Sequence, residues 1–312
     1  RGGDGQPRFD QEVPAGGYLW WYVDALSDDG HHGLTLIAFV GSVFSPYYAW
    51  ARRQGRADPM NHCALNVALY GQGARRWTMT ERSARHCGRD ATHFQIGPSQ
   101  VSWDGQALRI DIDEIGMPLP LRVRGQVRLY PQQLFNYSTP LEARGLHRWG
   151  PIAPQARIEV ELAQPQLRWQ GHAYLDSNEG DEPIDQGFRH WDWSRGELTD
   201  GSTAVIYDIE PEDPEGHVLA LRFTPDGRVL DFAPPPQQRL PRTAWGLRRR
   251  MRSSGPVRVL DQLEDTPFYQ RSMISAELEG ERLSCFHETL HVPRLIKPVV
   301  QAMLPWRMPR RI

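Results

Sequence analysis

The stretch LRVRGQVRL, residues 121–129, determines the fold class that we expect. Its apolar residues Leu121, Val123, Val127 and Leu129 recur at every second position, apart from a glycine in the middle, and arginine or glutamine fills the positions between them. A period of two is that of a β-strand with one face buried. We therefore predict a half-buried strand over these residues.

Turn signals separate several further runs of the same kind. The chain contains 28 glycines and 26 prolines, and no apolar 3.6-residue pattern continues beyond about two helical turns. Three acidic–glycine pairs, each between two short alternating runs, predict β-hairpins: Asp104-Gly105, Asp226-Gly227 and Glu279-Gly280. The sequence therefore predicts an all-β protein of barrels or sandwiches with little helix.

The segment GPIAPQ, residues 150–155, is rich in glycine and proline and separates two strand-rich halves. We expect a first β-domain over residues 1–150 and a second over residues 151–291, followed by a C-terminal tail over residues 292–312. Within the second half, APPPQQRLP, residues 233–241, predicts a rigid connection or a long loop.

The tail has the best helical pattern of the chain, but three prolines interrupt it: Pro293, Pro298 and Pro305. It mixes apolar residues with arginine and lysine, so packing on the second domain and lying at a membrane interface both remain open. The sequence contains no run of about 18 apolar residues and shows no signal peptide. We therefore expect neither a transmembrane helix nor secretion.

The composition is that of a globular protein, with 39% hydrophobic and 24% charged residues and a net charge of −2. Its 36 basic residues are spread along the strand-like runs and not clustered, so we expect no nucleic-acid partner. The cysteines Cys63, Cys87 and Cys285 have no regular spacing, which favours a reducing compartment over a disulfide framework.

One alternating stretch, LRWQGHAYLD at residues 167–176, combines several polar groups that could do chemistry. In an extended strand His172, Tyr174 and Asp176 share one face. That face lines a barrel interior or meets solvent, and the alternation alone leaves both readings open.

Two aromatic-rich stretches flank this strand. His147 and Trp149 lie next to the expected domain boundary, where they either line a ligand cleft or anchor an ordinary linker. Downstream, Trp191 and Trp193 belong to RHWDWSRGE, residues 189–197, which forms either a corner of the core or the wall of a cavity.

The sequence HETLH, residues 287–291, matches the zinc motif H-E-x-x-H, but that motif binds zinc only when it forms a helix. Here it continues the strand-like run RLSCFHETL, and Pro293 follows two residues later. The other histidine and cysteine pairs lack a second pair at zinc-finger spacing. We therefore predict no metal site.

Long and unusual stretches of the chain resemble a known family, the carotenoid 1,2-hydratases, also called hydroxyneurosporene synthases. The resemblance extends from about residue 9 to the final residues. It is clearest in GGYLWWYVDALSDDGHHGLTLIAFVGSVFSPYYAWARR (16–53), NHCALNVALYG (61–71), RWTMTER (76–82), HRWGPIAP (147–154), YLDSNEG (174–180) and HWDWSR (190–195).

The resemblance implies two lipocalin-like β-domains and hydration of the ψ end groups of acyclic carotenoids such as neurosporene and lycopene, in the pathways of purple bacteria. It implies neither an organic cofactor nor a metal, so the expected partners are the carotenoid and water. A cytoplasmic protein, peripheral at the photosynthetic or inner membrane, fits a substrate that is dissolved in lipid.

The family's functional pairs fall on matching residues of this chain. Its His-x-Trp pair corresponds to His147 and Trp149, and its Tyr-x-Asp pair to Tyr174 and Asp176, whose aspartate the family uses as the proton donor. We further expect three neighbouring side chains to contact the substrate: His172, Trp191 and Trp193.

Protonating an alkene requires an acid that is still neutral near pH 7, whereas an ordinary aspartate has a pKa of about 3.9. Burial in an apolar cavity raises a carboxyl pKa by up to about 3–5 units, so we assign Asp176 as general acid. The faces of Trp149 and Tyr174 would stabilise the cation by about 2 kcal/mol or more. His147 either tunes Asp176 or takes the proton from the attacking water.

Two other functions are compatible with the same residues. A lipocalin-like protein that only binds carotenoids or other lipids would release its ligand unchanged. An isomerase or cyclase of the same fold would give a product of unchanged mass. A gain of one water would distinguish a hydratase from both.

Overall fold

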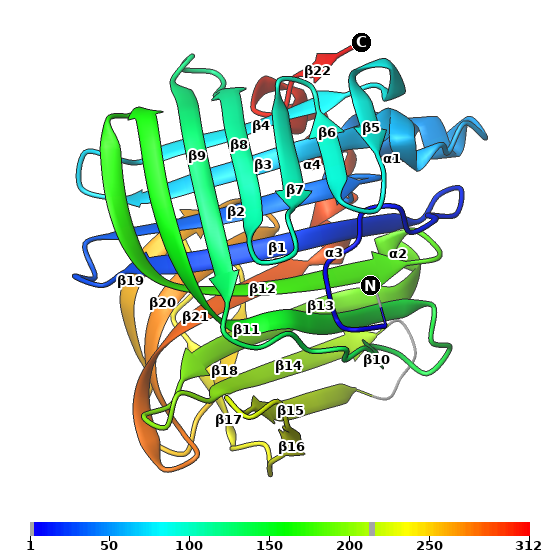
Figure 1. Ribbon diagram of the computed structural model, residues 1–312. Coiled ribbons are helices and arrows are strands. Elements are labelled where there is room, and N and C mark those ends of the chain that lie inside the picture. The colour runs from blue at the N-terminus through cyan, green and yellow to red at the C-terminus, as the bar shows by residue number, and fades with distance from the viewer. Residues whose placement is uncertain (1–2, 212–215) are drawn as a thin grey trace. The chain divides into compact units, whose positions relative to one another are not determined.

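The computed structural model describes residues 3–211 and 216–312, and strands make up most of them (Figure 1). The predicted all-β fold class is confirmed. The chain divides into two compact units, one formed by residues 1–183 with residues 301–312 and the other by residues 184–300. Each unit is described separately below.

The first unit is built, in its described residues, on one thirteen-stranded sheet with the order β22-β4-β3-β2-β1-β12-β11-β9-β8-β7-β6-β5, and with β10 paired to β11. In Figure 1 the strands β5 to β9 cross the strands β1 to β4, so that the sheet curls over itself. The strands are β1 (Tyr18–Ser27), β2 (His32–Val40), β3 (Cys63–Gly71), β4 (Arg76–Arg82), β5 (Cys87–Arg89), β6 (His93–Ile96), β7 (Ser99–Trp103), β8 (Leu108–Ile115), β9 (Arg122–Pro131), β10 (Thr139–Pro140), β11 (His147–Gln164), β12 (Leu167–Gly180) and β22 (Arg310–Arg311).

The apolar core of this unit fills the space inside the curled sheet. Leu19, Trp21 and Val23 of β1 and Leu175 of β12 belong to it, together with inward residues of the other strands. The alternate residues of β1, on the opposite face, are buried as well. Because both of its faces are covered, β1 is an almost unbroken apolar and aromatic run, as expected for a fully buried strand.

The predicted strand over residues 121–129 is confirmed as β9. The predicted boundary at residue 150 falls inside β11, which continues through the prolines of GPIAPQ. The pairing of β11 with β12 shifts register between Pro151 and Ala153 and again between Ala153 and Ala156. Such bulges accommodate residues that cannot donate a backbone hydrogen bond. The division into compact units comes later, after Pro183.

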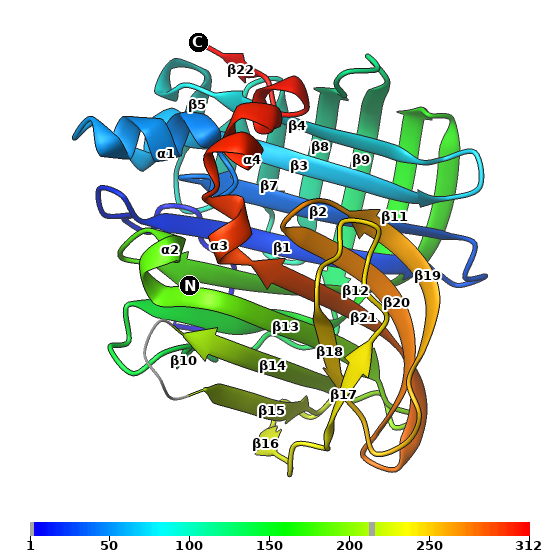
Figure 2. The same cartoon turned by 180° about the vertical axis from the view of Figure 1, so that it is seen from behind.

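The second unit contains, among the residues described, a seven-stranded sheet of order β16-β15-β14-β13-β21-β20-β19 and the two-stranded sheet β17-β18. Figure 2 shows the β17–β18 pair lying against one face of the larger sheet. The elements are α2 (Ile184–Gly187), β13 (Phe188–Glu197), β14 (Thr203–Pro211), β15 (His217–Phe223), β16 (Val229–Asp231), β17 (Gln237–Leu240), β18 (Arg249–Arg252), β19 (Arg258–Asp265), β20 (Tyr269–Leu278) and β21 (Glu281–His291).

All three predicted hairpins are present. The turns at Asp104-Gly105, Asp226-Gly227 and Glu279-Gly280 join β7 to β8, β15 to β16 and β20 to β21. The segment 233–241, expected to be a connection or loop, contains the short strand β17, which pairs with β18. Three of its prolines precede the strand and Pro241 follows it, so every residue of β17 keeps its backbone N–H donor.

The helices are short. They are α1 (Pro46–Arg53), η1 (Pro59–His62) and η2 (Ala84–His86), and in the tail α3 (Val292–Leu295), α4 (Pro298–Met303) and η3 (Leu304–Trp306). The three tail prolines stand at or next to the starts of these tail helices, where a missing N–H costs nothing. After them β22 pairs in parallel with β4. Among the described residues, none of the helices has the length and apolarity that crossing a membrane requires.

Candidate active site

Asp176 lies in the middle of β12 with two aromatic donors on one of its oxygens. Trp149 Nε1 on β11 and Tyr174 Oη on β12 each donate a hydrogen bond of 2.8 Å to Asp176 Oδ2. All three side chains are buried, and Asp176 is only 4% exposed. The structure therefore brings together three of the four residues predicted to be catalytic.

The strand register explains how the indole reaches the carboxyl. β11 and β12 are antiparallel, and Trp149 lies opposite Asn178. Asp176 is two residues further along β12, a diagonal neighbour within reach of a large aromatic side chain. Tyr174 reaches the same oxygen along its own strand, because residues two apart share a face.

A second Tyr-x-Asp pair, which the sequence analysis missed, lies on the adjacent strand β1. Tyr22 is opposite Asp176, and Asp24 is opposite Tyr174. Tyr22 Oη donates to Asp24 Oδ2 at 3.0 Å, and the rings of Tyr22 and Tyr174 meet edge to face with centroids 6.3 Å apart. The sequence holds a signal for this pair: YVD at residues 22–24 has the spacing of YLD at residues 174–176.

Further aromatic side chains lie on the same face of β1. The rings of Tyr18 and Trp20 are stacked at 4.9 Å, and Trp20 contacts Phe39 of β2 at 5.8 Å. Trp20 and Phe39 are buried. Trp20 and Tyr22 are alternate residues of β1, and Tyr22 lies opposite Asp176, so aromatic side chains occupy this face of β1 at and next to the position of Asp176.

His147, the fourth residue predicted to be catalytic, is fully buried at the start of β11. Its Nδ1 shares a hydrogen bond of 2.8 Å with Tyr18 Oη, and its Nε2 one of 3.1 Å with Glu182 Oε1. Burial lowers the pKa of His147 below its ordinary value, and Glu182 opposes that effect. The residue opposite His147 is Gly180, where a Cβ would lie 2.8 Å from His147 Nδ1. A side chain at 180 would therefore displace the imidazole.

The three residues expected to contact substrate differ in exposure and are divided between the two units. The side chain of His172 is 51% exposed, with its Nε2 3.5 Å from Asp28 Oδ1. Trp191 and Trp193 are buried on β13 of the second unit, where the Trp191 ring contacts Phe188 at 5.4 Å. Substrate contact by these three residues stays a prediction.

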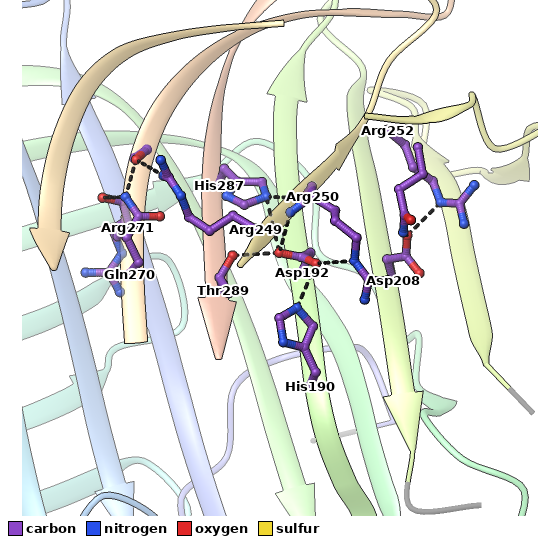
Figure 3. Close-up of polar contacts among 12 residues, drawn as sticks. His190, Asp192, Asp208, Arg249, Arg250, Arg252, Gln270, Arg271, His287 and Thr289 are labelled. Carbon is purple, nitrogen blue, oxygen red and sulfur yellow. Dashed lines mark hydrogen bonds and ion pairs between the residues drawn. The ribbon is translucent and has the colours of Figure 1, made fainter. Parts of the chain in front are cut away.

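The second unit has its own buried aspartate, Asp192 on β13 (Figure 3). Asp192 Oδ2 is 2.9 Å from His190 Nε2, and Oδ1 accepts a 2.6 Å hydrogen bond from Thr289 Oγ1. Arg250 adds its backbone N–H at 3.3 Å and its Nε at 3.5 Å. Burial by itself would raise the pKa of Asp192, but the hydrogen bond and charge of His190 and the charge of His287 hold it below its ordinary value.

The HETLH segment supplies part of this cluster. It lies in β21, which confirms the predicted extended conformation, so His287 and Thr289 point to the same face. His287 Nε2 is 2.7 Å from the carbonyl oxygen of Arg250. Asp192 and His287 therefore help to hold β18, through the backbone of Arg250, on the larger sheet.

A surface hollow of about 610 Å³ lies at the other end of β11 and β12, lined among others by Gln126, Glu161 and Arg168. Arg168 is eight residues from Asp176 along β12, roughly 26 Å at 3.3 Å per residue. The hollow is therefore not where the candidate catalytic residues meet.

Comparison with known proteins gives consistent matches over the chain. The family model described as carotenoid hydratase CrtC matches residues 36–312. The acyclic carotenoid 1,2-hydratase of Rubrivivax gelatinosus is 59% identical over 98% of this chain and 77% of the relative. That of Thiocapsa roseopersicina is 53% identical over 97% and 76%.

Among solved structures, an AttH protein from Nitrosomonas europaea superposes with a TM-score of 0.63 at 16% identity, covering 92% of this chain and 99% of that one. At this identity the likeness concerns the fold alone, and it confirms the predicted lipocalin-like architecture.

Proposed function

This chain belongs to the carotenoid hydratase CrtC family, and we propose that its Asp176 protonates the terminal 1,2 double bond of an acyclic carotenoid, with neurosporene and lycopene as substrates. The observation that supports this proposal is the convergence of Trp149 and Tyr174 on a single oxygen of a buried carboxyl. Water then captures the cation, and the product is a tertiary alcohol.

The chemistry requires one proton donor and a shielded cation. The π electrons of the double bond take the proton at carbon 2, which leaves a tertiary cation at carbon 1. A lone pair of water forms the new C–O bond there, and the water loses a proton. Carboxylic acids, imidazole and phenol are the side chains that transfer protons in such steps.

Asp176 is suited to the first step by its surroundings. Both aromatic donors meet Oδ2, so a proton on the neutral acid resides on Oδ1. Burial favours the neutral form, whereas the two hydrogen bonds favour the ionised form. The acid is thus held in one orientation. The carboxylate that remains after it has given up its proton is already stabilised by the two hydrogen bonds.

The cation at carbon 1 is stabilised by aromatic faces. Trp149, Tyr174 and Tyr22 surround the Asp176 carboxyl, with Trp20 further along β1. Desolvated cation–π contacts are worth about 2 kcal/mol or more, and the faces themselves do not react with the cation at carbon 1.

His147 acts through its neighbours. Both of its ring nitrogens are engaged, by Tyr18 and Glu182, and Tyr18 in turn stacks on Trp20. Its lowered pKa keeps the imidazole neutral next to a reaction that forms a cation. We assign His147 to positioning the aromatic side chains of β1.

Peripheral contact with a membrane would give access to a lipid-dissolved substrate. The tail exposes several apolar side chains, among them Val299 at 65% and Trp306 at 76%. An exposed tryptophan with nearby arginines suits the interface of an anionic bilayer. Flotation with anionic vesicles should retain the protein, and Val299→Ser/Trp306→Ser should weaken that retention; equal retention of both proteins would contradict the contact.

The catalytic proposal is tested with the purified full chain and lycopene in detergent. The expected product is heavier by one water, and Asp176→Asn should abolish it while the variant still folds and binds lycopene by absorption. Full hydration by Asp176→Asn removes the mechanism. Bound but unchanged lycopene with the unmodified protein would instead indicate a carrier, and a product of unchanged mass an isomerase or cyclase.

A further inference from the structure

We propose that Asp24 is the general base of the same site, the group that takes the proton from the attacking water. This assignment rests on the proposed role of Asp176 and adds a residue to it. It follows from the pairing of β1 with β12, which places two buried Tyr-x-Asp pairs face to face in inverted order.

The geometry is set by the register. Tyr22 faces Asp176 and Tyr174 faces Asp24, so the two aspartates are diagonal neighbours on one face of the sheet. Diagonal side chains of an antiparallel pair are about 7–8 Å apart. Asp24 is fully buried and Asp176 almost so. Each carboxyl accepts a hydrogen bond from the tyrosine of its own strand.

That separation matches the spacing required by an acid that protonates the substrate and a base that activates the attacking water. Enzymes that protonate a leaving atom with one carboxyl and activate water with another hold the two about 6.5–9.5 Å apart, which leaves room for the water. Alkene hydration makes the same demand, since the proton arrives at carbon 2 and the water attacks carbon 1, the adjacent atom.

The groups that face Asp24 from its own strand and from the two adjacent strands are two tyrosines, a threonine and the second aspartate. On its own strand Tyr22 donates to it, and on the β12 side it faces Tyr174 and Asp176. On the β2 side it lies opposite Thr35, whose Oγ1 accepts a 3.2 Å hydrogen bond from Tyr70 Oη. His147, the alternative base, already has both ring nitrogens hydrogen bonded. Asp24 is therefore the better placed acceptor.

The proton balance closes. Asp176 gives its proton to carbon 2 and becomes a carboxylate. Water forms the C–O bond at carbon 1 while its O–H bond breaks, and that proton passes to the Asp24 carboxylate. One water has been added, Asp24 is protonated and Asp176 is ionised. Return of the proton from Asp24 to Asp176 restores the resting state without any further reactant.

The two aspartates can be separated by isotope exchange in D₂O. A deuteron transferred from Asp176 to carbon 2 remains in the recovered lycopene when the cation turns about its C2–C3 bond and then loses the original hydrogen of carbon 2, whereas reversal without that rotation returns the same deuteron to Asp176. Asp24→Asn should lower hydration by about 10²-fold or more and still give deuterated lycopene. Asp176→Asn should lose both hydration and deuteration. Asp104→Asn, in the exposed turn after β7, is the matched control and should behave as the unmodified chain.

Three outcomes overturn the assignment to Asp24. They are hydration by Asp24→Asn within about threefold of the unmodified protein, loss of deuteration together with hydration in a variant that still binds lycopene, and unchanged hydration by Asp24→Glu. Should Asp24→Asn not fold, Asp24→Glu gives the same readout, because its displaced carboxylate should slow hydration and spare deuteration. Hydration by Asp176→Asn would refute Asp176 as the acid. The Asp24→Asn variant would still test Asp24 independently, through its own hydration rate and deuterium exchange.

Discussion

Asp176 in the first unit and Asp192 in the second are both buried in β-sheets, yet different kinds of group surround them. Asp176 accepts its hydrogen bonds from an indole and a phenol, which are neutral donors. Asp192 is contacted by two histidines, a threonine and an arginine. A positive charge beside a buried carboxyl favours the ionised form of that carboxyl, and a donor that bears no charge favours it less.

The difference shows what burial alone does not decide. Both carboxyls are about 4% exposed, so desolvation is similar for the two. The partners decide whether the group can donate a proton. Asp192 has a lowered pKa and helps to hold the β17–β18 pair on its sheet, which is a structural role. Asp176 is bonded by neutral aromatic donors, and the role that we propose for it is a chemical one.

Exchanging each aspartate for asparagine gives the largest expected contrast. Asp192→Asn puts an N–H donor in place of an acceptor oxygen that faces His190, Thr289 and Arg250, and it should destabilise the protein by about 1–3 kcal/mol. Asp176→Asn keeps an oxygen for both donors and should cost less than about 1 kcal/mol, while hydration falls by about 10³-fold. Urea denaturation and product mass measure the two effects. Equal loss of stability in both variants would abolish the distinction.

Glu114 of β8 provides a third buried carboxyl for the comparison. Burial is the main cause that raises its pKa to about 7, although Arg82 and Ser99 oppose it. Because the pKa of Glu114 is higher in the folded than in the unfolded protein, folding favours the neutral carboxyl. Its contribution to the free energy of unfolding is fully present below about pH 4.5 and is lost as the pH rises to about 7. Asp192 has the opposite sign, because its lowered pKa gives stability that disappears in acid.

Glu114→Gln should therefore remove a decline in stability between pH 4.5 and 7. The decline is worth a few kcal/mol, since one pKa unit corresponds to about 1.4 kcal/mol. Urea titrations at several pH values, run beside Asp111→Asn as a control with a half-exposed carboxyl on the same strand, measure it. An identical pH dependence in Glu114→Gln and the unmodified chain would show that Glu114 is ionised throughout.

Trp149→Phe tests whether the neutral donors matter to the acid. The variant keeps an aromatic face and loses the 2.8 Å hydrogen bond to Asp176 Oδ2. We expect hydration to fall about 10–100-fold, since a hydrogen bond to a charged group is worth about 1.5–3 kcal/mol, with lycopene binding little changed. Trp103→Phe is the control, because it also removes one indole hydrogen bond, the one of 2.8 Å that Trp103 Nε1 donates to the side chain of Gln6. Equal activity of the two variants would indicate that Trp149 contributes through packing and not through its hydrogen bond to Asp176.

Much of this was predictable from local patterns. Alternation and acidic–glycine turns predicted β9 and three hairpins correctly, because strand period and turn chemistry are local properties. The extended state of HETLH was predicted for the same reason. The unit boundary was less accessible: GPIAPQ reads as a break, but bulges let β11 continue through it. Nothing local reveals that a proline-rich segment has partners on both sides.

The residues of the candidate site were likewise only partly predictable from local sequence patterns. Tyr174 and Asp176 could be paired from their spacing. Trp149 was noticed at the expected domain boundary, but its catalytic role came only from the family resemblance. Asp24 escaped because it is about 150 residues from Asp176 in sequence, and only the register of β1 on β12 brings the two Tyr-x-Asp pairs together. Repeated short motifs become informative when two strands that contain them are adjacent in the sheet.

The smallest expected effect concerns the mirrored pair. Tyr22→Phe removes the 3.0 Å hydrogen bond to Asp24 Oδ2 and keeps the ring against Tyr174. The hydroxyl stabilises the ionised form that a base requires, so its loss should move the acidic limb of the pH–rate profile to higher pH. At the plateau, hydration should fall only a few-fold, since one neutral hydrogen bond is worth about 1 kcal/mol.

Tyr70→Phe loses a hydroxyl on β3, which is separated from β1 by β2. It should lower the plateau by no more than Tyr22→Phe and leave the acidic limb in place. A purely structural role for Tyr22 would lower the rate at every pH by the same factor. A shift of the limb with a nearly unchanged plateau would instead tie the phenol to the charge on Asp24, and so make the first unit's two aspartates, unlike Asp192, a working acid and base.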